Sequence, residues 1–163
     1  MISLPYSIYL ASPLGFLPYT RAFNEKLIAL ITRAGAQVLD PWSTDEGRSL
    51  GELCANGADD HEIAQANRRV GRANIAMIQS CDGLLACLDG ASVDDGTASE
   101  VGYAVGLGRV ASGFRLDSRS SGDNRATMVN LQIAALIDAS GGAIFTTPDL
   151  AIANLLEQLR SRR

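Results

Sequence analysis

Acidic side chains gather in one short stretch of this 163-residue chain. Asp94 and Asp95 come directly before Gly96, and Glu100 follows that glycine by four residues. Paired carboxylates suit glycosidic chemistry, in which one carboxylate attacks the anomeric carbon and the other acid gives a proton to the leaving group. Glu100 is therefore a candidate nucleophile, and Asp94 or Asp95 is a candidate acid.

A loop and a helix must position these acids. Gly96 permits a tight turn, and the pattern predicts a helix over residues 97–107 with Thr97 as its N-cap. Glu100 would then lie close to the positive end of the helix dipole, which favours an ionised carboxylate. However, Thr97-x-x-Glu100 is also the pattern of a capping box. Taken alone, this tetrapeptide favours a cap over a nucleophile.

Strands and helices alternate along the whole chain. Strands are predicted at 6–11, 37–40, 83–88, 109–115 and 143–146, and helices at 18–34, 59–80, 97–107, 128–139 and 148–160. This alternation predicts a single α/β domain over residues 1–163, with a doubly wound parallel five-stranded sheet and helices on both faces. Ligands bind such sheets beyond the carboxyl ends of the strands. The polar segments there are predicted to be loops, with at most one helical turn in 43–57 and a mobile loop at 116–126.

The composition limits the function classes. The net charge is −4, and the only dense basic cluster is Arg68, Arg69 and Arg72, so no nucleic-acid polymer is expected as a partner. No apolar run is long enough to span a membrane, and no basic segment precedes the first strand, so we expect a cytoplasmic protein without a membrane partner. Three cysteines without a C-x-x-C pair, and one histidine, predict neither a disulfide framework nor a metal site.

Two aromatic side chains lie in the loops beyond the first two strands. Phe16 follows Gly15, and Trp42 is the only tryptophan of the chain. Phe16 could stack on a base, and Trp42 could form the floor of a base pocket. Packing against the core explains Phe16 equally well and explains Trp42 better.

The acids belong to a longer pattern that covers most of the chain. Its most specific piece is Asp94-x-Gly96-Thr97-x-x-Glu100-x-Gly102-Tyr103-Ala104. The weaker pieces are Ile8-Tyr9-Leu10-Ala11, Ala73-Asn74 eight residues before Cys81-Asp82, Gly113-Phe114-Arg115-Leu116-Asp117-Ser118-Arg119, and Val129-Asn130-Leu131. In these pieces and in their order, the chain resembles the nucleoside 2-deoxyribosyltransferases.

The resemblance implies a flavodoxin-like fold and a ping-pong transfer of 2-deoxyribose between bases, as part of nucleotide salvage, without a metal or an organic cofactor. Glu100 matches the family's nucleophile, and Tyr9 matches a tyrosine that hydrogen-bonds and positions it. Asp94 matches the aspartate that binds and helps to protonate the base, with Asp95 as the second choice. Gly96 is expected to lie against the substrate.

The resemblance also implies a homo-oligomer. Asn130 matches an asparagine that reaches into the neighbouring subunit's site and binds the sugar hydroxyls, so at least a dimer is expected, with a hexamer as a larger option. Asn74 stands where one branch of the family has an aspartate. It can hydrogen-bond the sugar, but it cannot act as an acid or a base. That branch also offers a terminal aromatic residue to the base, whereas this chain ends in Arg163.

The expected ligands are purine 2′-deoxynucleosides and free bases, and the sequence leaves pyrimidines open. Two alternative functions also stay open. One is a deoxynucleoside 5′-monophosphate N-glycosidase, a hydrolase that grips a 5′-phosphate with serines and helix amides. Against it, the adjacent Asp94 and Asp95 would repel a phosphate. The other is a non-catalytic nucleotide-sensing module on the same fold.

Overall fold

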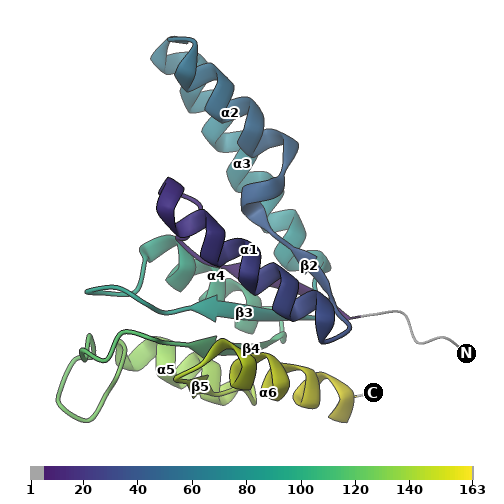
Figure 1. Ribbon diagram of the computed structural model, residues 1–163, viewed down its shortest axis with the longest axis vertical. Coiled ribbons are helices and arrows are strands. Elements are labelled where there is room, and N and C mark those ends of the chain that lie inside the picture. Colours follow the sequence, from purple (N-terminus) through teal and green to yellow (C-terminus); the bar gives the residue numbers. More distant parts are fainter. Residues whose placement is uncertain (1–5, 163) are drawn as a thin grey trace, which may run out of the picture.

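The computed structural model describes residues 6–162, and its centre is a five-stranded sheet (Figure 1). The strands are β1 (Ser7–Ala11), β2 (Gln37–Leu39), β3 (Gly83–Cys87), β4 (Val110–Phe114) and β5 (Ile144–Phe145). They lie in the order β2-β1-β3-β4-β5, and every neighbouring pair is parallel. This is the strand order of the flavodoxin-like fold. The predicted fold class is therefore confirmed.

Helices cover both faces of the sheet (Figure 1). On one face lie α1 (Pro18–Arg33) and α6 (Pro148–Ser161), and on the other α3 (Asp60–Ser80), α4 (Asp95–Gly106) and α5 (Leu131–Ala139). Two apolar clusters fill the space between these layers. The central strands β3 and β4 are buried along their whole length, which explains why β3 appears in the sequence as a continuous apolar run.

The segment 43–57 contains a helix that the sequence does not predict. A 3-10 turn η1 (Pro41–Ser43) leads into α2 (Asp45–Ala55), and the hydroxyl of Thr44 caps α2 by accepting from the Gly47 N–H at 3.1 Å. The loop prediction was wrong because glycines lower the helix propensity of this segment and none of its residues is buried. Packing against α3 supports α2, and the two helices form a hairpin that projects from the body of the molecule (Figure 1).

Other segments differ from the prediction at their ends. The helix predicted from residue 128 begins at Leu131 because Asn130 caps it, and the last strand is reduced to Ile144–Phe145. The polar segment 116–126, predicted to be a loop, contains no helix or strand, and the Ser121 N–H donates to the Met128 carbonyl at 3.0 Å. Within residues 6–162, no helix is both long and apolar enough to cross a membrane.

Candidate active site

The sheet brings Tyr9 and Glu100 together although they are far apart in the sequence. Tyr9 lies on β1 and is completely buried in the apolar cluster beneath α3 and α4. Its hydroxyl donates a hydrogen bond of 2.6 Å to Oε1 of Glu100 on α4. This is the only hydrogen bond to the Glu100 carboxylate from residues 6–162. A phenol fixed by burial therefore holds one oxygen of the carboxylate and leaves the other for a ligand.

Asp94, and not Thr97, is the N-cap of α4. Its Oδ2 accepts from the Thr97 N–H at 2.8 Å and from the Thr97 hydroxyl at 3.1 Å, and the helix begins at Asp95. The predicted start at Thr97 is wrong because aspartate and threonine are both preferred caps, and only the folded chain selects between them. Glu100 consequently lies in the second turn of α4, and the capping box suggested by Thr97-x-x-Glu100 does not form.

Burial, more than the helix end, sets the charge of Glu100. It raises the pKa of Glu100 to about 7, while the hydrogen bond from Tyr9 opposes the rise and the negative charge of Asp94 adds to it. The sequence led us to expect that the helix end keeps this carboxylate ionised, whereas its burial in the folded chain favours the neutral form. Burial also raises the pKa of the Tyr9 hydroxyl, which consequently remains a donor.

Glu100 lies in the wall of a cavity of about 450 Å³ between α3 and α4. The cavity is lined by Gly71, Asn74, Ile75, Ile78, Gly96, Ser99, Glu100 and Tyr103. Oδ1 of Asn74 is buried without a hydrogen-bond partner among the described residues. A buried acceptor without a donor costs free energy. Asn74 is therefore suited to accept a hydrogen bond from a ligand hydroxyl in this cavity.

Asp95 and Asn130 lie on the other side of α4, in a second cavity of about 560 Å³ between α4 and α5. Asn130 caps α5 by accepting from the Gln132 N–H at 2.9 Å, and its side-chain amide donates to Asp123 Oδ1 at 3.2 Å. Asn130 thus does not line the cavity of Glu100 within one chain. Helix α4 thus separates Asp95 and Asn130 from the cavity that Glu100, Asn74 and Gly96 line.

Phe16 and Trp42 form an aromatic pair beyond the carboxyl ends of β1 and β2. Their ring centroids are 4.5 Å apart in an edge-to-face arrangement. The indole N–H of Trp42 donates to the Ser12 carbonyl at 2.9 Å, and the indole fills the space in which a Cβ on Gly15 would lie. Trp42 is therefore packed against its own chain. Phe16, which is 67% exposed, carries the open aromatic surface.

A buried polar group beneath this pair was missed by the sequence analysis. Asn24 accepts from the Ser12 hydroxyl at 3.1 Å and donates to Asp40 Oδ1 at 3.5 Å. Asp40 also accepts from the Trp42 N–H at 3.2 Å, and burial raises the pKa of Asp40. The available signal was an asparagine on the apolar stripe of a predicted helix, since Asn24 shares a face with Leu27.

No group of three or more histidine, cysteine, aspartate or glutamate side chains within residues 6–162 is arranged to hold a metal ion.

The comparison with protein families gives a match over residues 8–132 to the model described as nucleoside 2-deoxyribosyltransferase. The chain belongs to the nucleoside 2-deoxyribosyltransferase family. The matched range includes Tyr9, Asn74, Asp94, Glu100 and Asn130.

The relatives of this chain include one protein described as uncharacterized and two solved structures that are described by an activity. An uncharacterized protein of Schizosaccharomyces pombe is 30% identical over 116 residues, which are 69% of this chain and 51% of that protein, so this chain spans about half of its length. The 2-desoxiribosyltransferase of Leishmania mexicana is 26% identical, with a TM-score of 0.64 and coverage of 94% and 98% of the two chains. The CMP N-glycosidase of Clostridium botulinum is 17% identical and shares the fold, with a TM-score of 0.53 and coverage of 94% and 98%.

The first prediction concerns the two neighbours of Glu100. Tyr9→Phe removes the hydrogen bond that opposes the rise in pKa, so the pKa of Glu100 should move above about 7. Asp94→Asn removes a negative charge, so the pKa of Glu100 should move below that value. Carbon-13 NMR titration of the glutamate carboxyl groups measures both shifts. Titration of Glu100 at the same pH in all three proteins would show that neither contact controls its charge.

The second prediction links Glu100 to stability. Its pKa is higher in the folded chain than the ordinary 4.5, so the stability contributed by the neutral carboxyl group is lost as the pH rises toward about 7. Glu100→Gln, which stays neutral, should be more stable than the parent at about pH 8 by on the order of 1–3 kcal/mol, less any part screened by solvent, and about equally stable near pH 4. Urea unfolding at both pH values measures the difference. A stabilisation of the same size at both values contradicts this account.

The third prediction concerns the aromatic pair. A Cβ at position 15 would lie 1.9 Å from Cδ2 of Trp42, so Gly15→Ala must displace the indole. Since Trp42 is the only tryptophan, its fluorescence emission should shift to longer wavelength in this variant as the ring gains solvent. Gly51→Ala is the matched control, because no atom lies within 4 Å of the new methyl group. Equal emission from both variants would show that the indole does not rest on Gly15.

Proposed function

We propose that the protein transfers 2-deoxyribose between nucleobases through a covalent deoxyribosyl ester on Glu100. The observation that carries this proposal is the 2.6 Å hydrogen bond from Tyr9 to Glu100 at the wall of a cavity that also presents Asn74. An attacking carboxylate must be held in one orientation. The Tyr9 phenol does this without a positive charge, which would weaken the nucleophile.

In the first half-reaction, ionised Glu100 attacks C1′ of a 2′-deoxynucleoside from the face opposite the base. The bond between C1′ and the base nitrogen breaks, and its electron pair leaves with the base, which takes up a proton. We assign the delivery of this proton to Asp94. Its Oδ2 caps α4, whereas its Oδ1 accepts no hydrogen bond from residues 6–162 and is available to the base.

Two observations favour Asp94 over Asp95 as the acid. The charge of Asp94 acts on the pKa of Glu100, and that of Asp95 is not among its causes. Asp95 instead lines the second cavity, on the α5 side of α4. The acid that assists the leaving base must lie near the carbon that Glu100 attacks. Asp94 meets that requirement better.

In the second half-reaction, another base occupies the place of the first and attacks C1′, and the Glu100 carboxylate leaves. The nitrogen of the incoming base returns its proton to Asp94, so the enzyme is restored and no net proton is consumed. Each half-reaction inverts the configuration at C1′, and the two together retain it. Exposed Phe16 is our candidate for stacking on the base, with Trp42 as its support.

A second copy of the chain completes the proposed site. Asn130 lies on the α5 side of α4, away from the cavity of Glu100. Its proposed contact with the sugar hydroxyls therefore requires a neighbouring subunit, and we propose a homo-oligomer of at least two chains. The proposed substrates are purine 2′-deoxynucleosides and free bases.

Hydrolysis of a nucleoside 5′-monophosphate is the second candidate, because the fold is shared with a CMP N-glycosidase. The residues that line the cavity of Glu100 include no lysine or arginine to bind a phosphate. A cavity lining without a cationic side chain favours an uncharged nucleoside as the donor.

The fourth prediction tests the proposed reaction. Incubation with deoxyinosine and adenine should yield deoxyadenosine and hypoxanthine, and Glu100→Ala should lower the rate by at least ~10³-fold. Glu52→Ala is the matched control because this glutamate is exposed on the projecting helix α2. Chromatography of the bases and nucleosides measures the rates. Transfer by Glu100→Ala at the parent rate, or hydrolysis of deoxyadenosine 5′-monophosphate in strong preference to deoxyadenosine, would overturn the proposal.

A further inference from the structure

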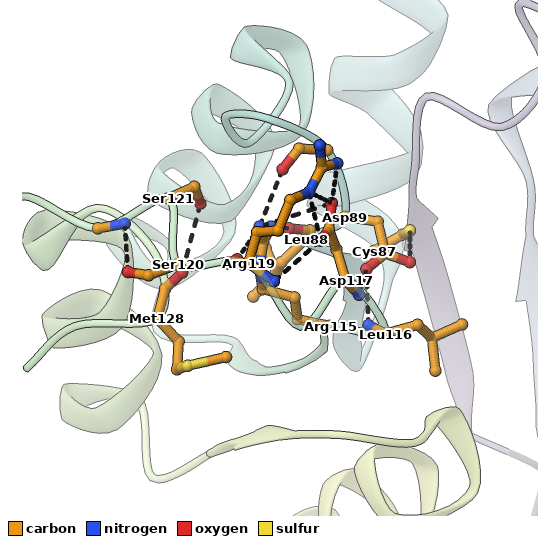
Figure 2. Close-up of polar contacts among 12 residues, drawn as sticks. Cys87, Leu88, Asp89, Arg115, Leu116, Asp117, Arg119, Ser120, Ser121 and Met128 are labelled. Atoms are coloured by element: carbon orange, nitrogen blue, oxygen red, sulfur yellow. Dashed lines mark hydrogen bonds and ion pairs between the residues drawn. The ribbon is translucent and has the colours of Figure 1, made fainter. Parts of the chain in front are cut away.

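A polar cluster joins the loops that follow β3 and β4, and the proposed mechanism does not use it (Figure 2). Arg115, the first residue after β4, is only 3% exposed. Its guanidinium donates to the backbone carbonyls of Leu88 and Gly90, in the loop after β3, and to that of Arg119 in its own loop. The bond to Gly90 measures 2.9 Å and the bond to Arg119 measures 2.7 Å.

Asp89 makes the same kind of connection in the opposite direction (Figure 2). From the end of β3, its Oδ1 accepts from the backbone N–H of Leu116 at 2.6 Å and from that of Asp117 at 2.8 Å. The acid after β3 thus binds the loop after β4, and the arginine after β4 binds the loop after β3. We call these two sets of hydrogen bonds the Asp89–Arg115 clasp.

The clasp is a costly way to stabilise a fold. The carboxylate nearest to the Arg115 guanidinium is Asp117, at 4.0 Å, and Arg119 already binds that carboxylate. Nε of Arg115 is buried without a partner among the described residues. A buried cation with so little charge compensation loses solvation energy that an apolar residue would not lose. Stability alone therefore explains the clasp poorly, and a role in placing other groups explains it better.

The loop after β3 leads to Asp94 in the proposed active site, and the loop after β4 leads to Asn130, which we place in the site of a neighbouring subunit. The loop after β3 runs from Asp89 to Asp94, the cap of α4, and turns at Gly90, where φ is 121°. The loop after β4 runs to Asn130, the cap of α5. Residues that follow the two loops, Asp95 and Asn130 among them, line one cavity. The clasp therefore fixes the spacing of two loops whose ends carry proposed site residues.

We propose that the Asp89–Arg115 clasp holds Asp94 where it can protonate the leaving base, so that Asp89 and Arg115 are positioning residues for the first half-reaction. This inference rests on the proposed function. Glu100 does not depend on the clasp in the same way, because Tyr9 holds its carboxylate from β1. Loss of the clasp should thus slow proton delivery by Asp94 much more than attack by Glu100.

The fifth prediction separates these two steps. Asp89→Ala removes the acceptor of both amides, whereas Asp89→Asn keeps a side-chain oxygen that can accept both. Formation of the glycosyl-enzyme is measured in single turnovers with deoxyinosine, whose base needs a proton to leave, and with 4-nitrophenyl 2-deoxyribofuranoside, whose leaving group departs as a stable anion. Asp89→Ala should slow the first donor by roughly 10- to 100-fold, a part of what a positioned acid contributes, and the second by less than about threefold. Asp89→Asn should restore most of the first rate.

Asp82→Ala is the matched control. Asp82 Oδ2 also accepts a backbone N–H, that of Ser7 at 2.8 Å, but it joins β3 to β1 at the opposite, amino edge of the sheet. This variant should lose stability without changing the ratio of the two donor rates. If Asp89→Ala slows both donors equally, or if Asp82→Ala changes the ratio as much, the clasp is only structural and the proposal is overturned.

A second measurement does not depend on activity. Amide hydrogen exchange at Gly96 and Thr97, which follow the Asp94 cap, should become faster in Asp89→Ala and should stay at the parent rate in Asp89→Asn and Asp82→Ala. If the parent protein transfers no deoxyribose, the proposed function fails while this exchange still tests the clasp. Unchanged exchange at Gly96 and Thr97 in Asp89→Ala would overturn the proposal that the clasp positions Asp94, even if the parent protein is an active enzyme.

Discussion

The proposed chemistry depends on one contact inside the fold, the hydrogen bond from the buried Tyr9 hydroxyl to the Glu100 carboxylate. The burial that makes this contact rigid also raises the pKa of Glu100 to about 7. Rigidity and incomplete ionisation thus have the same physical origin, because removing water from a carboxylate disfavours its charge. The site therefore holds a poorly solvated carboxylate in a fixed position, and the same burial favours its neutral form.

The strand order explains why this contact exists. Residues that follow β3 can meet β1 only because these two strands are neighbours in the order β2-β1-β3-β4-β5. In a flavodoxin-like sheet the order in which successive strands are added reverses between β1 and β3. Ligands bind in the crevice beyond the carboxyl ends of these two strands. Glu100 from α4 and Asn74 from α3 line the cavity, and Tyr9 from β1 holds Glu100 from the buried side. The Asp89–Arg115 clasp lies one strand further along, where it ties the loop that carries Asp94 to the loop that leads to Asn130.

The sequence predicts the fold better than it predicts the state of the site. Fully buried strands leave continuous apolar runs, so the sheet could be predicted, whereas α2 buries none of its residues and left no such pattern. The start of α4 was misplaced because Asp94 and Thr97 are both residue types that cap helices. Burial at Glu100, which raises its pKa, cannot be inferred from the spacing of residues in the sequence. The clasp links Arg115 to a carbonyl 27 residues away, a contact that no local pattern indicates.

Mass spectrometry of the intact protein tests the central claim most directly. The protein is mixed with a 2′-deoxynucleoside in the absence of an acceptor base and quenched with acid. We expect a mass gain of one deoxyribosyl unit, which peptide mapping locates at Glu100 and which disappears when a free base is added before the quench. Release of the base without any such adduct, or an adduct on Asp94 or Asp95, would contradict the account.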